Sequence, residues 1–158
     1  MENRYLYKAK RTDNSEWVQG YYVKGSDMYG EEVHVIFETD AIFYSHGEMD
    51  GFAEINPATI CQCTGLKDKN GKLIWENDII SFQRDNDDCP FPNKDTKKRL
   101  GKVFWQDFRA DFAIGMGRNG SKSLNDDLWK YVRNGNRVEV MGNIFDDPEL
   151  LEGKNHAD

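Results

Sequence analysis

The sequence predicts a mainly β fold of short strands with one or two short helices. Apolar and polar residues alternate over short runs, and these runs are rich in aromatic and β-branched residues. Turn-forming residues such as Asp13-Asn14, Gly30 and His46-Gly47 separate the runs. With 38% apolar and 31% charged residues, the 158-residue chain has the composition of a folded protein and not of a disordered one.

The N-terminal part, residues 1–63, is expected to be an acidic β part. Its predicted strands cover residues 5–10, 17–24, 33–37, 41–44 and 52–55. Pro57 closes this series, and residues 59–63 lead into a hairpin. The part holds 5 Lys and Arg against 11 Asp and Glu, so most of the net charge of −7 belongs to it.

A hairpin is predicted next, with Asn70 and Gly71 at its tip. Asn-Gly is the strongest short-range hairpin signal, because both residues tolerate the positive φ that a type I′ turn requires. An apolar strand leaves the turn, and residues 78–83 alternate as a further strand.

The rest of the second part, residues 64–152, continues as short strands around a polar insertion at residues 84–99. Strands are expected at 100–106, 108–114 and 137–145, with Val138 and Val140 facing the core. Ser123 is followed by an acid three residues later, which predicts a short helix or 3₁₀ turn. Asp147, Pro148 and Glu149 predict a second helix start with an acidic cap, and residues 153–158 form a tail. Such a length fits one compact domain or two small β units sharing a core.

Cys61 and Cys63 lie two apart in a predicted strand, so both thiols point to the same face. They could be half of a zinc site, but only Cys89 and scattered histidines remain to complete one. We therefore expect buried core thiols, no bound metal and no cofactor.

Two further motifs carry little weight. The glycines at 115, 117 and 120 match a dinucleotide-binding pattern literally, but no long helix follows them. The acidic run at 85–88 lacks the glycine and glutamate that a calcium loop requires.

One basic cluster stands out, at residues 94–102, with aromatic residues close behind it. Its members are Lys94, Lys97, Lys98, Arg99 and Lys102, followed by Trp105. Cations beside stacking rings are what single-stranded nucleic acid binding needs. A solvated loop entering an aromatic strand has the same composition, and the negative net charge disfavours nucleic acid.

The chain shows no Gly-x-Ser-x-Gly, His-Glu-x-x-His or Cys/His nucleophile signature, so no catalytic residue is predicted. An enzyme of unrecognised type is the distant alternative. No secretory h-region opens the chain, and no apolar stretch is long enough to cross a membrane, so a cytoplasmic location is expected.

Two sequence blocks resemble the signature of the YopX family of phage and prophage proteins. The first holds Thr64-Gly65-Leu66, Asp68, Asn70-Gly71, Ile74-Trp75-Glu76 and Asp78-Ile79. The second, residues 138–151, is an alternating strand that runs into Gly142-Asn143-Ile144-Phe145 and then Pro148-Glu149-Leu150-Leu151. Asn77 stands where the family usually has Gly, and Asn also adopts the left-handed conformation.

The resemblance implies a mostly β fold with an SH3-like, partly open barrel in the second half. It also implies a phage or prophage origin in a bacterial host, a family without an established activity and no catalytic residues. Together with the exposed β edges expected of such a chain, this favours a non-catalytic binding or assembly module. It would act on an unknown protein partner or through self-association.

Overall fold

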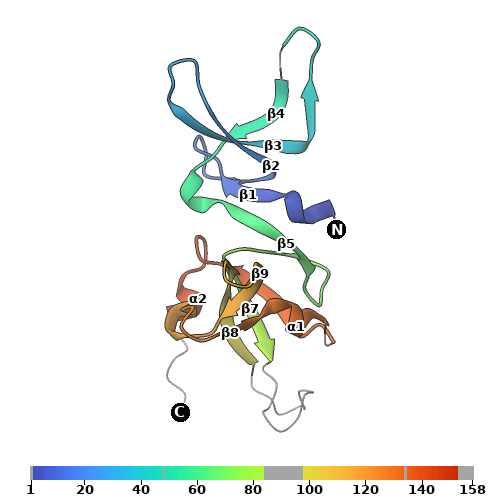
Figure 1. The fold of residues 1–158 in the computed structure, drawn as a ribbon, viewed down its shortest axis with the longest axis vertical. Helices are drawn as coiled ribbons and strands as arrows, with labels where there is room; N and C mark the ends of the chain where they lie inside the picture. Colours follow the sequence, from blue (N-terminus) through green and yellow to red (C-terminus); the bar gives the residue numbers. More distant parts are fainter. Residues whose placement is uncertain (1, 48, 84–97, 134, 153–158) are drawn as a thin grey trace. The chain divides into compact units, whose positions relative to one another are not determined.

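The structure, a computed structural model, describes residues 2–47, 49–83, 98–133 and 135–152, and it is mainly β (Figure 1). The predicted fold class is confirmed at this level. The chain divides into two compact units, residues 1–63 (unit 1) and residues 64–158 (unit 2).

Unit 1 is an antiparallel sheet in the order β4-β3-β2-β1-β5. Its elements are η1 (Glu2–Tyr5), β1 (Tyr7–Lys10), β2 (Trp17–Ser26), β3 (Glu32–Phe43), β4 (Met49–Glu54), η2 (Pro57–Thr59) and the start of β5 (Cys61–Lys67).

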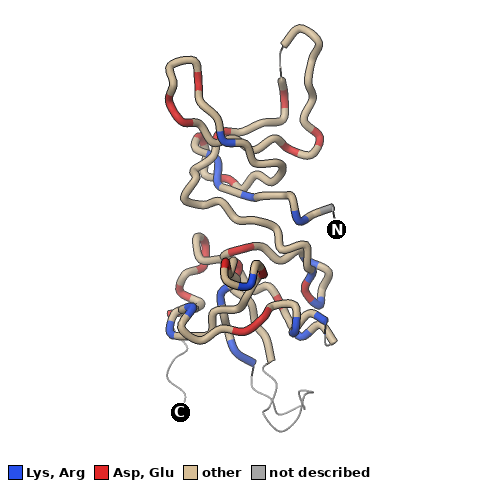
Figure 2. Tube along the Cα trace, in the orientation of Figure 1, with Lys and Arg blue, Asp and Glu red and all other residues tan. Residues whose placement is uncertain are grey.

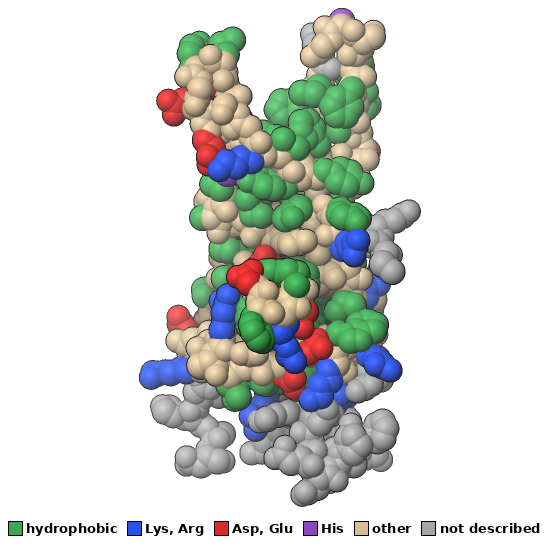
Figure 3. All heavy atoms as spheres, viewed as in Figure 1, with side chains coloured by type: hydrophobic (Ala, Val, Ile, Leu, Met, Phe, Trp, Pro, Cys, Tyr) green, Lys and Arg blue, Asp and Glu red, His purple; other side chains and the backbone are tan. Residues whose placement is uncertain are grey.

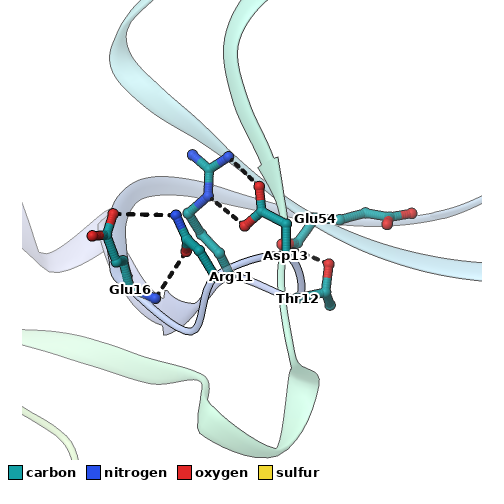
Figure 4. Close-up of polar contacts among 6 residues, drawn as sticks. Arg11, Thr12, Asp13, Glu16 and Glu54 are labelled. Carbon is teal, nitrogen blue, oxygen red and sulfur yellow. Dashed lines mark hydrogen bonds and ion pairs between the residues drawn. The ribbon is translucent and has the colours of Figure 1, made fainter.

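The sheet of unit 1 curls until the residues after β1 meet those at the end of β4. Arg11 forms a bridge with Ile55, and the Thr12 N–H donates to the Glu54 carbonyl at 3.0 Å. Figure 4 shows this corner, where the Arg11 guanidinium also pairs with the Asp13 carboxylate at 2.7 Å. The ion pair is exposed and contributes little to stability.

The inner face of the curl holds the core of unit 1. Its buried residues are Ala9, Val18, Ile36, Ala53 and Ile55. Cys61 and Cys63 are also fully buried, as predicted for core thiols. No group of three or more His, Cys, Asp or Glu residues in the described ranges is placed to hold a metal ion.

Two strand predictions for unit 1 are wrong. The first strand begins at Tyr7, because Tyr5 closes the 3₁₀ turn η1. The predicted strands at 33–37 and 41–44 are one strand, β3, whose register to β4 shifts between Phe37 and Ile42. Gly51 permits the shift, since it has φ +79° and a Cβ there would lie 2.8 Å from Ala41 Cα.

Unit 2 contains a second antiparallel sheet in the order β10-β9-β8-β7-β11, together with the end of β5 paired to β6. Its elements are β6 (Leu73–Trp75), β7 (Asp78–Gln83), β8 (Lys98–Gln106), β9 (Asp111–Gly115), η3 (Arg118–Gly120), β10 (Asn125–Asp127), α1 (Leu128–Arg133), β11 (Val138–Asn143) and α2 (Glu149–Glu152).

The core of unit 2 is larger than that of unit 1. Its buried residues are Ile74, Ile80, Phe82, Val103, Ile114, Leu128, Tyr131 and Val138. Val140 packs against the cluster, so the predicted inward direction of Val138 and Val140 is confirmed. Strand β7 covers the residues that alternation predicted.

The predicted type I′ turn at the hairpin tip is wrong, although the tip itself lies at Asn70 and Gly71. Gly71 has φ +83°, whereas Asn70 has no positive φ. The Gly71 N–H donates to the Asp68 carbonyl and the Asp68 N–H to the Lys72 carbonyl, at 3.0 and 2.8 Å. This is a three-residue hairpin loop, a type I turn followed by a left-handed glycine.

Three boundaries in unit 2 also differ from prediction. Residues 98 and 99 belong to β8, not to the polar insertion, and Phe108 lies in the β8–β9 turn ahead of β9. Ser123 does not cap a helix, because residues 125–127 pair with β9 and α1 starts only at Leu128. The cap there is Asp127, whose carboxylate accepts from the Trp129 N–H at 2.8 Å.

Several predictions fall outside the described residues: the insertion at 84–97 with Cys89, Lys94 and Lys97, the acidic run at 85–88, and the tail at 153–158. Within the described part, no helix is long and apolar enough to cross a membrane.

Candidate functional site

Asp68, the first acidic residue of the signature, serves the fold of unit 2. Its side chain is 3% exposed, and its Oδ1 accepts from the backbone N–H groups of Asn70 and Lys72 at 2.8 and 2.9 Å. Its Oδ2 accepts from the Val140 N–H at 3.0 Å. Burial raises the pKa of Asp68, but the three backbone donors outweigh burial, so the pKa lies below its ordinary value.

The turn from Trp75 to Asp78 is also held by hydrogen bonds that stabilise the fold of unit 2. The Asp78 carboxylate, 2% exposed, accepts from the N–H of the buried Trp75 at 2.8 Å. Asn77 has φ 66°, which confirms that it replaces glycine in a left-handed position. Its N–H donates to the Val103 carbonyl, and its own carbonyl accepts from the Ile144 N–H.

In the second block of the signature, the side chain of Asp147 packs against the end of β11. A Cβ at Gly142 would lie 2.3 Å from Asp147 Oδ2, so a side chain does not fit there. That same oxygen accepts from the Asn143 N–H at 3.1 Å, so the Asp147 side chain reaches back to β11 and not forward as the predicted helix cap. Pro148 then precedes α2, and in the first block Gly65 has φ +76°. These signature residues are accounted for by the architecture of unit 2.

The described residues of the basic cluster, Lys98, Arg99 and Lys102, divide between the two faces of β8. Lys98 and Arg99 are exposed at the start of β8, where Figure 2 shows a basic stretch. Because side chains alternate along a strand, Lys98 and Lys102 lie on one face of β8 and Arg99 and Trp105 on the other. The Trp105 ring packs edge-on against Phe112, with ring centroids 5.1 Å apart.

A different surface in unit 1 gathers exposed aromatic residues. Tyr21 pairs with Phe37 across β2 and β3, and Phe37 pairs with Phe52 across β3 and β4. Directly paired residues point to the same side of a sheet, and this side is opposite to the buried Ile36. The Phe43 ring stacks on Phe37 at 5.9 Å.

We call this surface the outer aromatic face and define it as Tyr21, Val23, Phe37, Phe43 and Phe52. Tyr21 is 52% exposed, Phe43 67% and Phe52 46%. Figure 3 shows hydrophobic side chains gathered over β2, β3 and β4 on the visible side of unit 1. Isolated exposed apolar residues are ordinary, whereas a contiguous patch marks an interaction site.

Sequence reasoning missed this surface, although a signal was present. In residues 17–24 and 33–37, both alternating sets contain large apolar residues. A strand with one solvated face would carry polar residues in one of the two sets.

The inner face near the core carries a chain of polar contacts along β2 and β3. The Tyr22 hydroxyl contacts His34 Nδ1 at 2.6 Å, His34 Nε2 contacts Glu32 at 2.8 Å, and Glu32 pairs with Lys24 at 2.7 Å. Each group satisfies its neighbour, so the chain stabilises the ribbon of β2 and β3.

Comparison with known proteins gives one family and several solved structures, two of which are described here. The family model described as "YopX protein" matches residues 6–152. The fold is similar to that of protein EF1440 from Enterococcus faecalis, with 21% identity, TM-score 0.55, and coverage of 92% of this chain and 96% of that one. It is also similar to protein yopX from Bacillus subtilis, with 15% identity, TM-score 0.50, and coverage of 94% and 96%. No curated protein sequence matches the chain.

Proposed function

The chain belongs to the YopX family, and on this premise we propose that it is a non-catalytic binding or assembly module whose working surface is the outer aromatic face of unit 1. The observation that carries the proposal is the row of Tyr21, Phe37 and Phe52, in which Phe37 is partly buried and the two outer rings, Tyr21 and Phe52, are about half exposed. Keeping such rings in water costs free energy that a partner would recover.

The size of the surface supports a protein partner. Large side chains with about half their area exposed offer on the order of 100 Å² each. The outer aromatic face with Met49 therefore presents on the order of 500 Å², enough for one side of a small protein interface. The exposed members on this side of the sheet are Tyr21, Val23, Phe43, Met49 and Phe52.

The absence of catalysis is part of the proposal. It rests on the signature residues, since the carboxylates of Asp68, Asp78 and Asp147 are each bound to backbone N–H groups. Carboxylates committed in this way are unsuited to proton transfer with a substrate.

Photo-crosslinking in the cells that produce the protein tests this proposal. A photo-reactive benzoyl-phenylalanine in place of Phe52 should give discrete protein adducts. The matched control is the same substitution at Phe108, an isolated ring that is 95% exposed in the β8–β9 turn. Adducts at 108 as strong as those at 52, or none at 52, would contradict the proposal.

Three further assignments belong to the proposed function: the fold class of unit 2, the origin of the protein and its location. We place unit 2 in the SH3-like class of partly open barrels, supported by the meander from β7 to β10 with β11 returning beside β7. A phage or prophage origin and a cytoplasmic location in the bacterial host complete the assignment. The origin is supported by the family resemblance, and the location by the absence of a long apolar stretch in the sequence.

A second candidate function is weak binding of single-stranded nucleic acid through the basic loop at 94–102. The exposed Lys98 and Arg99 support it, and Lys122 adds a cation 4.6 Å from the Phe104 ring. The placement of Trp105 on the other face from Lys102 opposes it.

Fluorescence titration of labelled oligonucleotides at low and moderate salt tests this candidate. Binding should weaken with a log-log slope of about −0.7 per phosphate contacted and should fall in an Arg99→Gln variant. Arg109→Gln, in the exposed β8–β9 turn, is the control. The candidate fails if no binding is detected at low salt.

A further inference from the structure

We propose that the occupant of the outer aromatic face is a second copy of this chain, which makes the protein a symmetric homo-oligomer. The inference rests on the proposed function, because it names the partner of the same surface. Four observations on unit 1 support a second copy over an unrelated protein.

The far end of the β3–β4 hairpin exposes large apolar side chains that a partner would bury. Figure 1 shows this hairpin extending away from the rest of unit 1. Ile42, Phe43, Tyr44 and Met49 are all between 44% and 67% exposed there. Because neighbouring residues of a strand point to opposite sides, Ile42 and Phe43 leave both sides of the ribbon apolar. A two-stranded ribbon is marginally stable in water without such a cover.

Unit 1 also has a small core for its length. Of the eight buried apolar residues in the described part of unit 1, four are small: Ala9, Ala53, Cys61 and Cys63. Units of this size are usually reinforced by disulfides, a metal ion or oligomerisation. The described residues hold buried thiols and no metal-binding group, so oligomerisation is the reinforcement that we infer.

The area and its symmetry fit self-association. A twofold dimer uses the same patch on both copies, and a patch on the order of 500 Å² on each side gives about 1,000 Å² in total, the size at which a specific interface begins. A partner that reinforces folding must be present whenever the chain is made. A second copy meets that condition.

The acidity of residues 1–63 does not prevent the contact. The row formed by Tyr21, Phe37 and Phe52 contains no charged side chain. Two copies can therefore pack row against row without burying like charges, while the carboxylates around the patch remain in solvent and are screened by salt.

Sedimentation velocity of the purified full chain across the micromolar range tests the inference. The wild-type protein should sediment as an oligomer, and Phe52→Glu should weaken self-association on the order of 30-fold or more. Phe43→Ser should act in the same direction, and it decides the result if Phe52→Glu does not fold by circular dichroism. Phe108→Glu is the matched control and should sediment as the wild type does.

A wild-type protein that stays monomeric at every concentration would overturn the inference, as would an oligomer that neither variant weakens. Its failure differs from failure of the proposed function. A monomer that still crosslinks to another protein through position 52 keeps the binding surface and refutes only the second copy.

Discussion

The Asp68 carboxylate and the Val140 N–H, 72 positions apart in the chain, form a hydrogen bond of 3.0 Å between Oδ2 and N. The bond joins the two sequence blocks of the family signature. Strand pairing joins them again, since Gly142 and Asn143 pair with Ile79 and Asp78. The signature therefore describes how unit 2 closes, which explains why it identifies a family without indicating a reaction.

Asp68→Asn should destabilise the protein. An asparagine can still accept from Asn70 and Lys72 through one oxygen, but its amide would face the Val140 N–H, donor against donor. The unsatisfied buried donor should lower the free energy of unfolding by about 1–3 kcal/mol in urea denaturation. Asp13→Asn, at an exposed side chain of the β1–β2 turn, is the matched control and should leave it nearly unchanged.

Stability should fall in acid, in part because of Asp68. The pKa of Asp68 is lower in the folded protein than the value of about 3.9 of an unfolded aspartate. The stabilisation is therefore fully present above the unfolded pKa and is lost as the pH falls through the folded one. Unfolding measured from neutral to acidic pH should show a shallower loss in Asp68→Asn than in the wild type. Equal pH dependence in the two proteins would show that Asp68 does not contribute.

Asp111→Asn should act in the opposite direction. Burial raises the pKa of Asp111, and the nearby Asp127 charge raises it further. Its Oδ1 is buried without a hydrogen-bond partner in the described residues. The favourable state is the protonated one, so stability from this group is lost as the pH rises through the raised pKa.

Removing the charge should therefore raise the free energy of unfolding at neutral pH by on the order of 0.5 kcal/mol. The gain should vanish in acid, where Asp111 is protonated. Thermal unfolding at the two pH values checks it, with Asp107→Asn in the neighbouring exposed turn as control. A gain that persists unchanged in acid would rule out the charge as its cause.

Gly71→Val should cost on the order of 1–2 kcal/mol, because a β-branched residue resists positive φ. Gly25→Val is a close control. A Cβ at either glycine meets no atom within 4 Å, but only Gly71 has a positive φ, of +83°. Equal destabilisation by the two substitutions in urea denaturation would remove backbone conformation as the reason.

The sequence predicted correctly those structural features that depend on neighbouring residues in the chain. Alternation predicted β7, and the conformational range of Asn predicted its left-handed role at Asn77. The continuity of β3 was not predictable in this way, because it depends on Gly51 packing against Ala41 from another strand. Strand β10 was missed because Asn125–Asp127 is polar throughout and forms only by backbone pairing with β9.

The candidate site shows the same division. Sequence proximity grouped Lys102 with Trp105, whereas the strand sends them to opposite faces. Tyr21 and Phe52 are 31 positions apart in the sequence. They lie in one row only because each of them pairs with Phe37, one from β2 and the other from β4. Such a surface is set by strand order and register, which the sequence specifies only through long-range pairing.

Hydroxyl-radical footprinting tests the central claim most directly, by comparing side-chain oxidation inside producing cells with oxidation of the unfolded chain. If the outer aromatic face is a working protein interface, Tyr21, Phe43 and Phe52 should be strongly protected in cells. Phe108, equally aromatic and more exposed, should be oxidised nearly as fast as in the unfolded chain. Oxidation of the three face residues at the same relative rate as Phe108 would contradict the claim that this face is covered when the protein works.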